Sequence, residues 1–142
     1  MDGRSCGLLE LSRDECLRRL TSASFGRIVF TSNALPAIRP VNHIMDGGAI
    51  IIRTRIGTAH RSATGTVVAY EIDDIDPVTH TGWSVIVTGL AQLVRKPDEV
   101  ARYEALLTPW VDGQLNQVIR IEPQLVTGYR LAPDSANDHA TG

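Results

Sequence analysis

The feature that most constrains the fold of this chain is a series of short apolar runs, rich in Ile and Val, between Gly26 and Leu131. Runs of this length and composition, bounded by turn-forming residues, are typical of β-strands. We predict six or seven strands, drawn from Gly26–Thr31, Ala37–Met45, Ala49–Thr54, Thr66–Ile72, Gly82–Val94, Gln117–Ile121 and Leu125–Leu131. Asp46-Gly47-Gly48, between the second and third of these, indicates a tight hairpin.

Helical patterns occur at only two places. Ser12-Arg13-Asp14-Glu15 has the form of a capping box and predicts a helix at about 12–22. Pro97 opens a second helical pattern, which ends at Thr108-Pro109. Because helices do not alternate with strands, a Rossmann-type nucleotide fold is disfavoured. The pattern predicts a mainly β, antiparallel domain that closes into a barrel or a sandwich, with an N-terminal helix and one inserted helix.

The chain has 142 residues, which suits one domain. We expect that domain at residues 12–132, an N-terminal tail at 1–11 and a disordered C-terminal tail at 133–142. The net charge of -2 gives no electrostatic reason to expect nucleic acid. No run approaches the ~18 apolar residues of a membrane span, and the first residues lack the apolar core of a signal peptide. We therefore expect a cytoplasmic protein with no membrane contact and two free cysteines.

Arginine supplies nearly all the positive charge, and Lys96 is the single lysine. The segment from Ile50 to Arg61 is an apolar strand that ends in cations and hydroxyls. Alternation places Arg53 and Arg55 on the face opposite Ile52. Arg53 and Arg61 could clamp an anion bidentately, so this segment is a candidate phosphate cradle. A solvated, arginine-rich strand end fits the same pattern.

Three further groups are candidates. Asn42, after Pro40, offers a donor and an acceptor to the edge of a heterocycle. Trp83 and Trp110 could stack on a planar ligand or pack in the core. The acidic cluster from Glu71 to Asp76 could hold a metal or form a carboxylate pair, although a solvated loop is the plainer interpretation. The sequence contains no nucleophile elbow, P-loop or zinc motif, so a cofactor must supply any chemistry.

Six segments of the chain form an ordered series of motifs. They are Phe25-Gly26-Arg27-Ile28-Val29-Phe30-Thr31, Leu35-Pro36 through Arg39-Pro40-Val41-Asn42, Ile52-Arg53-Thr54 with Gly57-Thr58, Val68-Ala69-Tyr70-Glu71-Ile72-Asp73-Asp74, Gly82-Trp83-Ser84-Val85 with Thr88-Gly89, and Val126-Thr127-Gly128. Taken in this order, the segments resemble the flavin-binding split barrels of the pyridoxamine 5'-phosphate oxidase-like family, in the branch akin to nitroimidazole-resistance proteins. The resemblance spans about residues 8–132.

The resemblance implies a homodimeric split barrel with FMN in a cleft between the subunits. Pro40, Val41 and Asn42 would line the isoalloxazine ring. The other implied contacts are Arg53 and Thr54 on the ribityl–phosphate side, Gly57, Thr58, His60 and Arg61 at the phosphate, and Trp83 and Trp110 near the cleft or the dimer interface.

The chain departs from the family pattern at His60, where the family often has Lys, and at Tyr129, where related proteins tend to carry Arg. A histidine is mostly neutral at pH 7, so either phosphate binding is weak or Arg53 and Arg61 compensate for the missing charge. The expected function is an FMN-dependent oxidoreductase acting on a small molecule. The alternatives are a non-catalytic sensor or carrier of flavin, deazaflavin or haem, and a ligand-free dimer that acts as an interaction protein.

Overall fold

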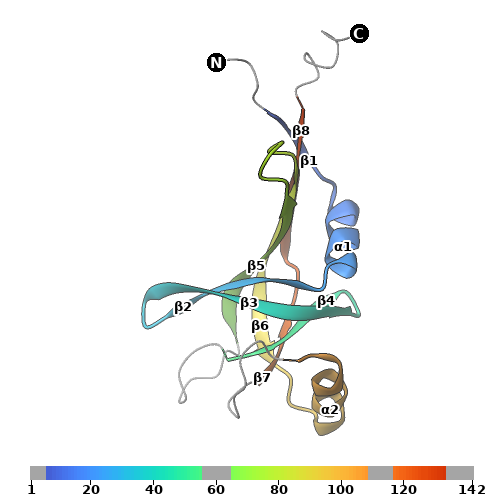
Figure 1. Cartoon of the computed structure of the whole chain (residues 1–142). Coiled ribbons are helices and arrows are strands. Elements are labelled where there is room, and N and C mark those ends of the chain that lie inside the picture. The colour runs from blue at the N-terminus through green and yellow to red at the C-terminus, as the bar shows by residue number, and fades with distance from the viewer. Residues whose placement is uncertain (1–5, 56–64, 109–116, 134–142) are drawn as a thin grey trace.

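The computed structural model describes residues 6–55, 65–108 and 117–133, and these form eight strands and two helices (Figure 1). In chain order they are β1 (Cys6–Glu10), α1 (Arg13–Ser22), β2 (Phe25–Ser32), β3 (Leu35–Asp46), β4 (Ala49–Thr54), β5 (Thr66–Ile75), β6 (Gly82–Leu93), α2 (Pro97–Leu106), β7 (Gln117–Ile121) and β8 (Leu125–Pro133).

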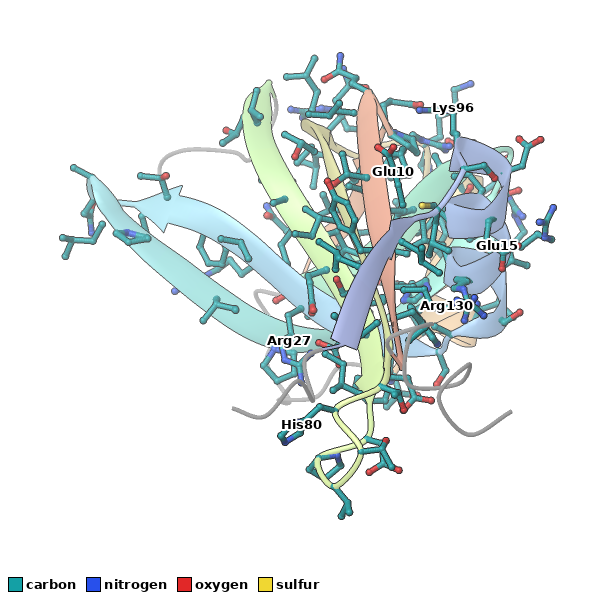
Figure 2. All side chains as sticks on the ribbon, turned by 90° about the horizontal axis from the view of Figure 1, so that it is seen from above. Glu10, Glu15, Arg27, His80, Lys96 and Arg130 are labelled. Atoms are coloured by element: carbon teal, nitrogen blue, oxygen red, sulfur yellow. The ribbon has the colours of Figure 1, made fainter. Side chains whose placement is uncertain are left out.

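Six strands close into an antiparallel barrel. The sheet order is β1-β8-β6-β5-β2-β3-β4-β7. Because β7 also pairs with β6, the six strands β6, β5, β2, β3, β4 and β7 form a closed ring. β8 and β1 extend the sheet beyond β6, and α1 packs against this extension (Figure 1). Seen from above, β2 and β3 run out to one side of the molecule while α1 lies on the other (Figure 2). The predicted mainly β split barrel with two helices is therefore confirmed.

The predicted N-terminal tail is wrong for residues 6–10, which form β1. β1 pairs with β8 along its whole length, with Leu8 opposite Leu131. Five residues with no alternating pattern give little local signal, and this strand is ordered by its long-range partner. β5 also continues to Ile75, past the point where we predicted a polar loop, because Asp74 and Ile75 pair with the start of β6.

Local chemistry explains the long β3 and its hairpin. Asp46 pairs with Ala49, and both intervening glycines have positive φ (59° and 83°), as a two-residue turn of the predicted kind requires. β4 pairs with the last four residues of β3, so among the described strands the first part of β3 pairs only with β2. Pro36 and Pro40 lie in that part, where a missing N–H does not interrupt a second ladder.

Two clusters of buried side chains hold the barrel and α2 together. The larger fills the barrel and includes Ile28, Ile52 and Tyr70. The smaller lies between β4, β7 and α2 and includes Ile51 and Tyr103. Successive residues of β4 are therefore buried on both faces, one by the barrel and one by α2. Arg53, next in the strand, emerges at the edge of the smaller cluster.

The predicted start of α1 is confirmed, since the Ser12 hydroxyl accepts a hydrogen bond from the Glu15 N–H at 3.1 Å. The Glu15 carboxylate bonds to Arg18, one turn further along the helix. α1 inserts Cys16, a buried free thiol, and Leu20 into the larger cluster. Neither helix of the described chain has the length and apolarity needed to cross a membrane.

Candidate functional site

The structure brings two of the predicted flavin-binding side chains together on the outside of the barrel. Asn42 on β3 and Arg53 on β4 both reach the C-terminal end of α2. The Asn42 Nδ2 donates to the Thr108 carbonyl at 3.1 Å, and the Arg53 Nη1 donates to the Leu107 carbonyl at 3.0 Å. The site is therefore the junction where β3, β4 and the end of α2 meet.

Arg53 is the principal cation of this junction. Its Nη1 also lies 3.4 Å from the Glu104 carbonyl, and its Nη2 lies 3.9 Å from the Glu104 carboxylate. A guanidinium beside the last carbonyls of a helix satisfies free acceptors and complements the helix dipole. The Nε atom of Arg53 is buried and has no hydrogen-bond partner among the described residues. Arg53 thus fixes the end of α2 and keeps one donor unused.

Because side chains alternate along a strand, some of the other predicted cofactor-binding residues face the interior of the barrel and not the face that carries Asn42 and Arg53. Val41 is 3% exposed and Thr54 is 7% exposed, and both side chains are buried. A ligand on the Asn42–Arg53 face could meet these two residues only through their backbone. Pro40 is exposed on β3. The remaining predicted residues, Gly57, Thr58, His60, Arg61 and Trp110, lie outside the described residues.

Arg39 was not predicted as a site residue, yet it joins the same two strands. Its guanidinium lies 4.9 Å from the centre of the Phe30 ring and donates a hydrogen bond to the Arg55 carbonyl. It thereby connects β3 to the end of β4, just before the segment that carries Thr58 and His60. The sequence signal for this role is a cation directly before Pro40 in a strand.

A buried polar pair lies behind the candidate site. His43 is 3% exposed, and its Nε2 lies 2.8 Å from the Leu20 carbonyl. Because a carbonyl can only accept, Nε2 carries the proton, and Nδ1 accepts from the Tyr70 hydroxyl at 2.6 Å. Burial lowers the pKa of His43 and raises the pKa of Tyr70, so both stay neutral. The pair ties α1 to β3 and β5 directly behind Val41 and Asn42.

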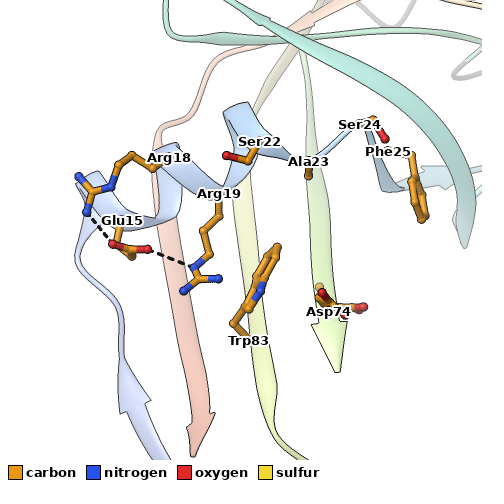
Figure 3. Close-up of a pocket in the computed structure, with 10 residues that line it drawn as sticks. Glu15, Arg18, Arg19, Ser22, Ala23, Ser24, Phe25, Asp74 and Trp83 are labelled. Carbon is orange, nitrogen blue, oxygen red and sulfur yellow. Dashed lines mark hydrogen bonds and ion pairs between the residues drawn. The ribbon is translucent and has the colours of Figure 1, made fainter. Parts of the chain in front are cut away.

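Trp83 lies on the α1 side of the molecule, and its role near a cleft between subunits or at a dimer interface stays a prediction. It begins β6 under α1, where the Arg19 guanidinium lies 4.7 Å from the centre of the indole ring (Figure 3). Trp83 also packs against the larger core cluster, which agrees with the core alternative. A cavity of about 740 Å³ opens beside it, between α1 and the ends of β5 and β6. The contacts of Trp83 are thus on the α1 side and not beside Arg53.

The prediction of a solvated acidic loop is wrong for Asp73, which lies within β5 beyond the predicted end of the strand. Glu71 and Asp73 share one face, as alternation predicted, and Arg27 on β2 binds them at 3.1 and 3.3 Å. Partial burial and the nearby Asp73 raise the pKa of Glu71 to about 7, against the opposing effect of Arg27. Within residues 6–55, 65–108 and 117–133, no three His, Cys, Asp or Glu side chains gather to hold a metal ion.

Comparison with known proteins shows which family this chain resembles in sequence and in fold. The family model described as pyridoxamine 5'-phosphate oxidase matches residues 12–136. An uncharacterized protein of Mycobacterium tuberculosis, Rv0080, is 54% identical over 134 residues, which cover 90% of this chain and 88% of that protein.

Two solved structures have the same fold and appreciable sequence identity. A candidate pyridoxamine 5'-phosphate oxidase from Corynebacterium glutamicum is 34% identical, with a TM-score of 0.71 over 89% of this chain and 99% of the other. An FAD-binding protein from Mycobacterium smegmatis is also 34% identical, with a TM-score of 0.65 over 87% of this chain and 97% of the other. On these matches, the chain belongs to the pyridoxamine 5'-phosphate oxidase family.

Proposed function

We propose that this protein is a flavin-dependent oxidoreductase that binds FMN at the junction of β3, β4 and the end of α2. The observation that carries the proposal is the family match over residues 12–136. The FAD-binding relative at 34% identity supports a flavin. When bound, the flavin supplies the capacity to accept and donate a hydride or electrons.

The described residues at the junction suit this cofactor. Pro40 and Asn42 lie on the outer face of β3, where they would line the flat ring system. The buried Nε of Arg53, unpartnered within the described chain, is a donor that an anionic ligand could satisfy. Thr58, His60 and Arg61 follow β4 after a few residues, so the phosphate would lie beyond the end of that strand.

The second copy of the chain is the expected partner. The outer face of the sheet carries exposed apolar side chains on four of the five successive strands from β8 to β3, namely Leu125 on β8, Ile86 on β6, Val67 on β5 and Ile38 on β3. Contiguous exposed apolar surface is typical of an interaction site. Light scattering on protein eluting from a sizing column, at tens of micromolar, should give the mass of a dimer. A monomer at that concentration would contradict this part of the proposal.

The direct test of the flavin is a spectrum of the purified protein followed by titration with FMN and, separately, with FAD. We expect flavin absorbance bands or saturable binding at micromolar FMN. Arg53→Gln should weaken that binding, because it removes the charge and the unused donor. Arg130→Gln, an exposed change on β8, is the matched control and should bind as the wild type does. Absence of both bands and binding would refute the proposal.

A non-catalytic flavin carrier is the second candidate. The described residues that we place against the flavin are Pro40, Asn42 and Arg53. None of these three side chains is suited to general acid or base catalysis at neutral pH. Oxidation of reduced nicotinamide by the flavin-loaded protein would favour the enzyme. Bound flavin without turnover would favour the carrier, and the same assay with deazaflavin and haem would identify a different resident cofactor.

A further inference from the structure

The cavity beside Trp83, which we call the α1 cavity, has no role in the proposed flavin site (Figure 3). It opens where α1 ends and the chain enters β2. Its volume of about 740 Å³ falls within the range of roughly 300–1,000 Å³ that is usual for small-molecule sites. The chemistry of its walls can therefore be compared with that of a ligand.

Two aromatic rings line the cavity. Trp83 stands between Arg19 on one side and Asp74 on the other, and Phe25 lies on the Asp74 side (Figure 3). The Phe25 side chain is 48% exposed, which is high for so large an apolar ring. Planar groups pack well against such rings, and aromatic contacts contribute beyond the area that they bury. The rings favour a flat ligand.

The α1 end of the cavity is cationic. Arg18 and Arg19 share a single carboxylate, that of Glu15, whose Oε2 lies 3.3 Å from the Arg19 Nε. That Nε is buried and makes no hydrogen bond in the described part of the chain. Among the described residues, the Arg19 guanidinium contacts the Glu15 carboxylate and the Trp83 ring, and these contacts do not use all five of its N–H donors. This end can bind an anionic group.

The β5 end of the cavity is anionic. Asp73 directs its carboxylate to Arg27 at 3.3 Å. Asp74, the next residue, pairs with Trp83 in the sheet and lines the cavity. Within the described residues no cation lies within ion-pair distance of the Asp74 carboxylate. This end can accept hydrogen bonds from an ammonium group, which compensates its charge.

We propose that the α1 cavity binds a planar aromatic small molecule that carries an anionic group at one end and an ammonium group at the other. The ring would lie against Trp83 and Phe25, the anion at Arg19 and the ammonium at Asp74. This site does not depend on the flavin proposal. It adjoins the flavin strand, however, because Phe25 pairs with Asn42 across β2 and β3.

The test uses para-(aminomethyl)benzoate as the probe, with para-toluate and benzylamine as analogues that each lack one charged group. Binding is followed at the Trp83 indole N–H in proton–nitrogen correlation spectra, with the resonance assigned from Trp83→Phe. We expect the zwitterion to bind more tightly than either analogue. Arg19→Gln should weaken its binding about five- to tenfold and remove its advantage over benzylamine. Asp74→Asn should remove its advantage over para-toluate.

Arg95→Gln is the control, because Arg95 is exposed and follows the far end of β6 from Trp83. It should leave all three affinities unchanged. The proposal is overturned if none of the probes shifts the Trp83 resonance at millimolar concentration. It is also overturned if the three probes bind equally, or if Arg19→Gln and Asp74→Asn leave the affinities unchanged. Flavin titration of the same samples reports separately on the flavin proposal.

Discussion

Tyr70 and His43 form a buried pair whose contribution to stability can be measured by removing one oxygen atom. Tyr70 is fully buried in the barrel, and its hydroxyl donates to the His43 Nδ1 at 2.6 Å. Tyr70→Phe keeps the ring and deletes the donor, so Nδ1 becomes a buried acceptor with no partner. An unsatisfied buried polar group costs about 1–3 kcal/mol. We expect the free energy of unfolding to fall by that amount at about pH 8, where His43 is neutral in both states.

The pH dependence gives the sharper check. The folded-state pKa of His43 is lowered by burial, so the unfolded chain binds more protons and stability falls as the pH drops below about 6.5. The fall is at most about 1.4 kcal/mol per pH unit from this group. In the wild type a protonated Nδ1 can donate to the Tyr70 oxygen, whose own proton can turn to the Val41 carbonyl. In Tyr70→Phe the protonated Nδ1 has no acceptor, so the deficit of the variant should persist as the pH falls.

Urea unfolding followed by tryptophan fluorescence, at about pH 8 and about pH 5.5, measures both quantities, provided that the dependence on denaturant is unchanged. Tyr129→Phe is the matched control. Its side chain is 38% exposed, so its loss should change stability by no more than about 0.5 kcal/mol. The reasoning is wrong if Tyr70→Phe is as stable as the control at the higher pH. It is equally wrong if the deficit disappears on acidification.

Three further predictions rest on other parts of the molecule. Gly89→Ala should lower the free energy of unfolding by at least about 3 kcal/mol, because the new Cβ would lie 1.7 Å from the Glu122 carbonyl oxygen. Gly7→Ala is the control and should be tolerated, since its Cβ would lie 3.9 Å from the nearest atom. Thermal unfolding compares the two variants. The folded-state pKa of Glu71 is raised to about 7, so ionisation of this group lowers the free energy of unfolding as the pH rises from about 4.5 to 7. Glu71→Gln should remove this decrease in urea titrations across the same pH range. A variant with the pH profile of the wild type would contradict this prediction. Asn42→Ala should weaken FMN binding less than Arg53→Gln does, since Asn42 is uncharged; absorbance titration ranks the two, and the reverse order would refute the assigned roles.

Local sequence was sufficient for most of the barrel. Seven strands were predictable because each is a run of β-branched residues bounded by turn-forming ones. The hairpin at Gly47 and Gly48 and the starts of both helices followed from residues adjacent in the chain. β1 was not predictable in this way, because Cys6–Glu10 has no pattern of its own and becomes a strand only by pairing with β8.

For the candidate site, too, the sequence predicted some features and only the tertiary structure showed the others. The sequence alone pointed to Asn42 and Arg53 as polar residues within largely apolar strands, and alternation predicted the face that Arg53 occupies. Only the tertiary structure decided that both bind carbonyls at the end of α2, at positions far away in the chain. It also decided that Trp83 lies against Arg19. Spacing along a strand determines which way a side chain points, whereas what it meets there depends on closure of the barrel and packing of the helices, which no local pattern encodes.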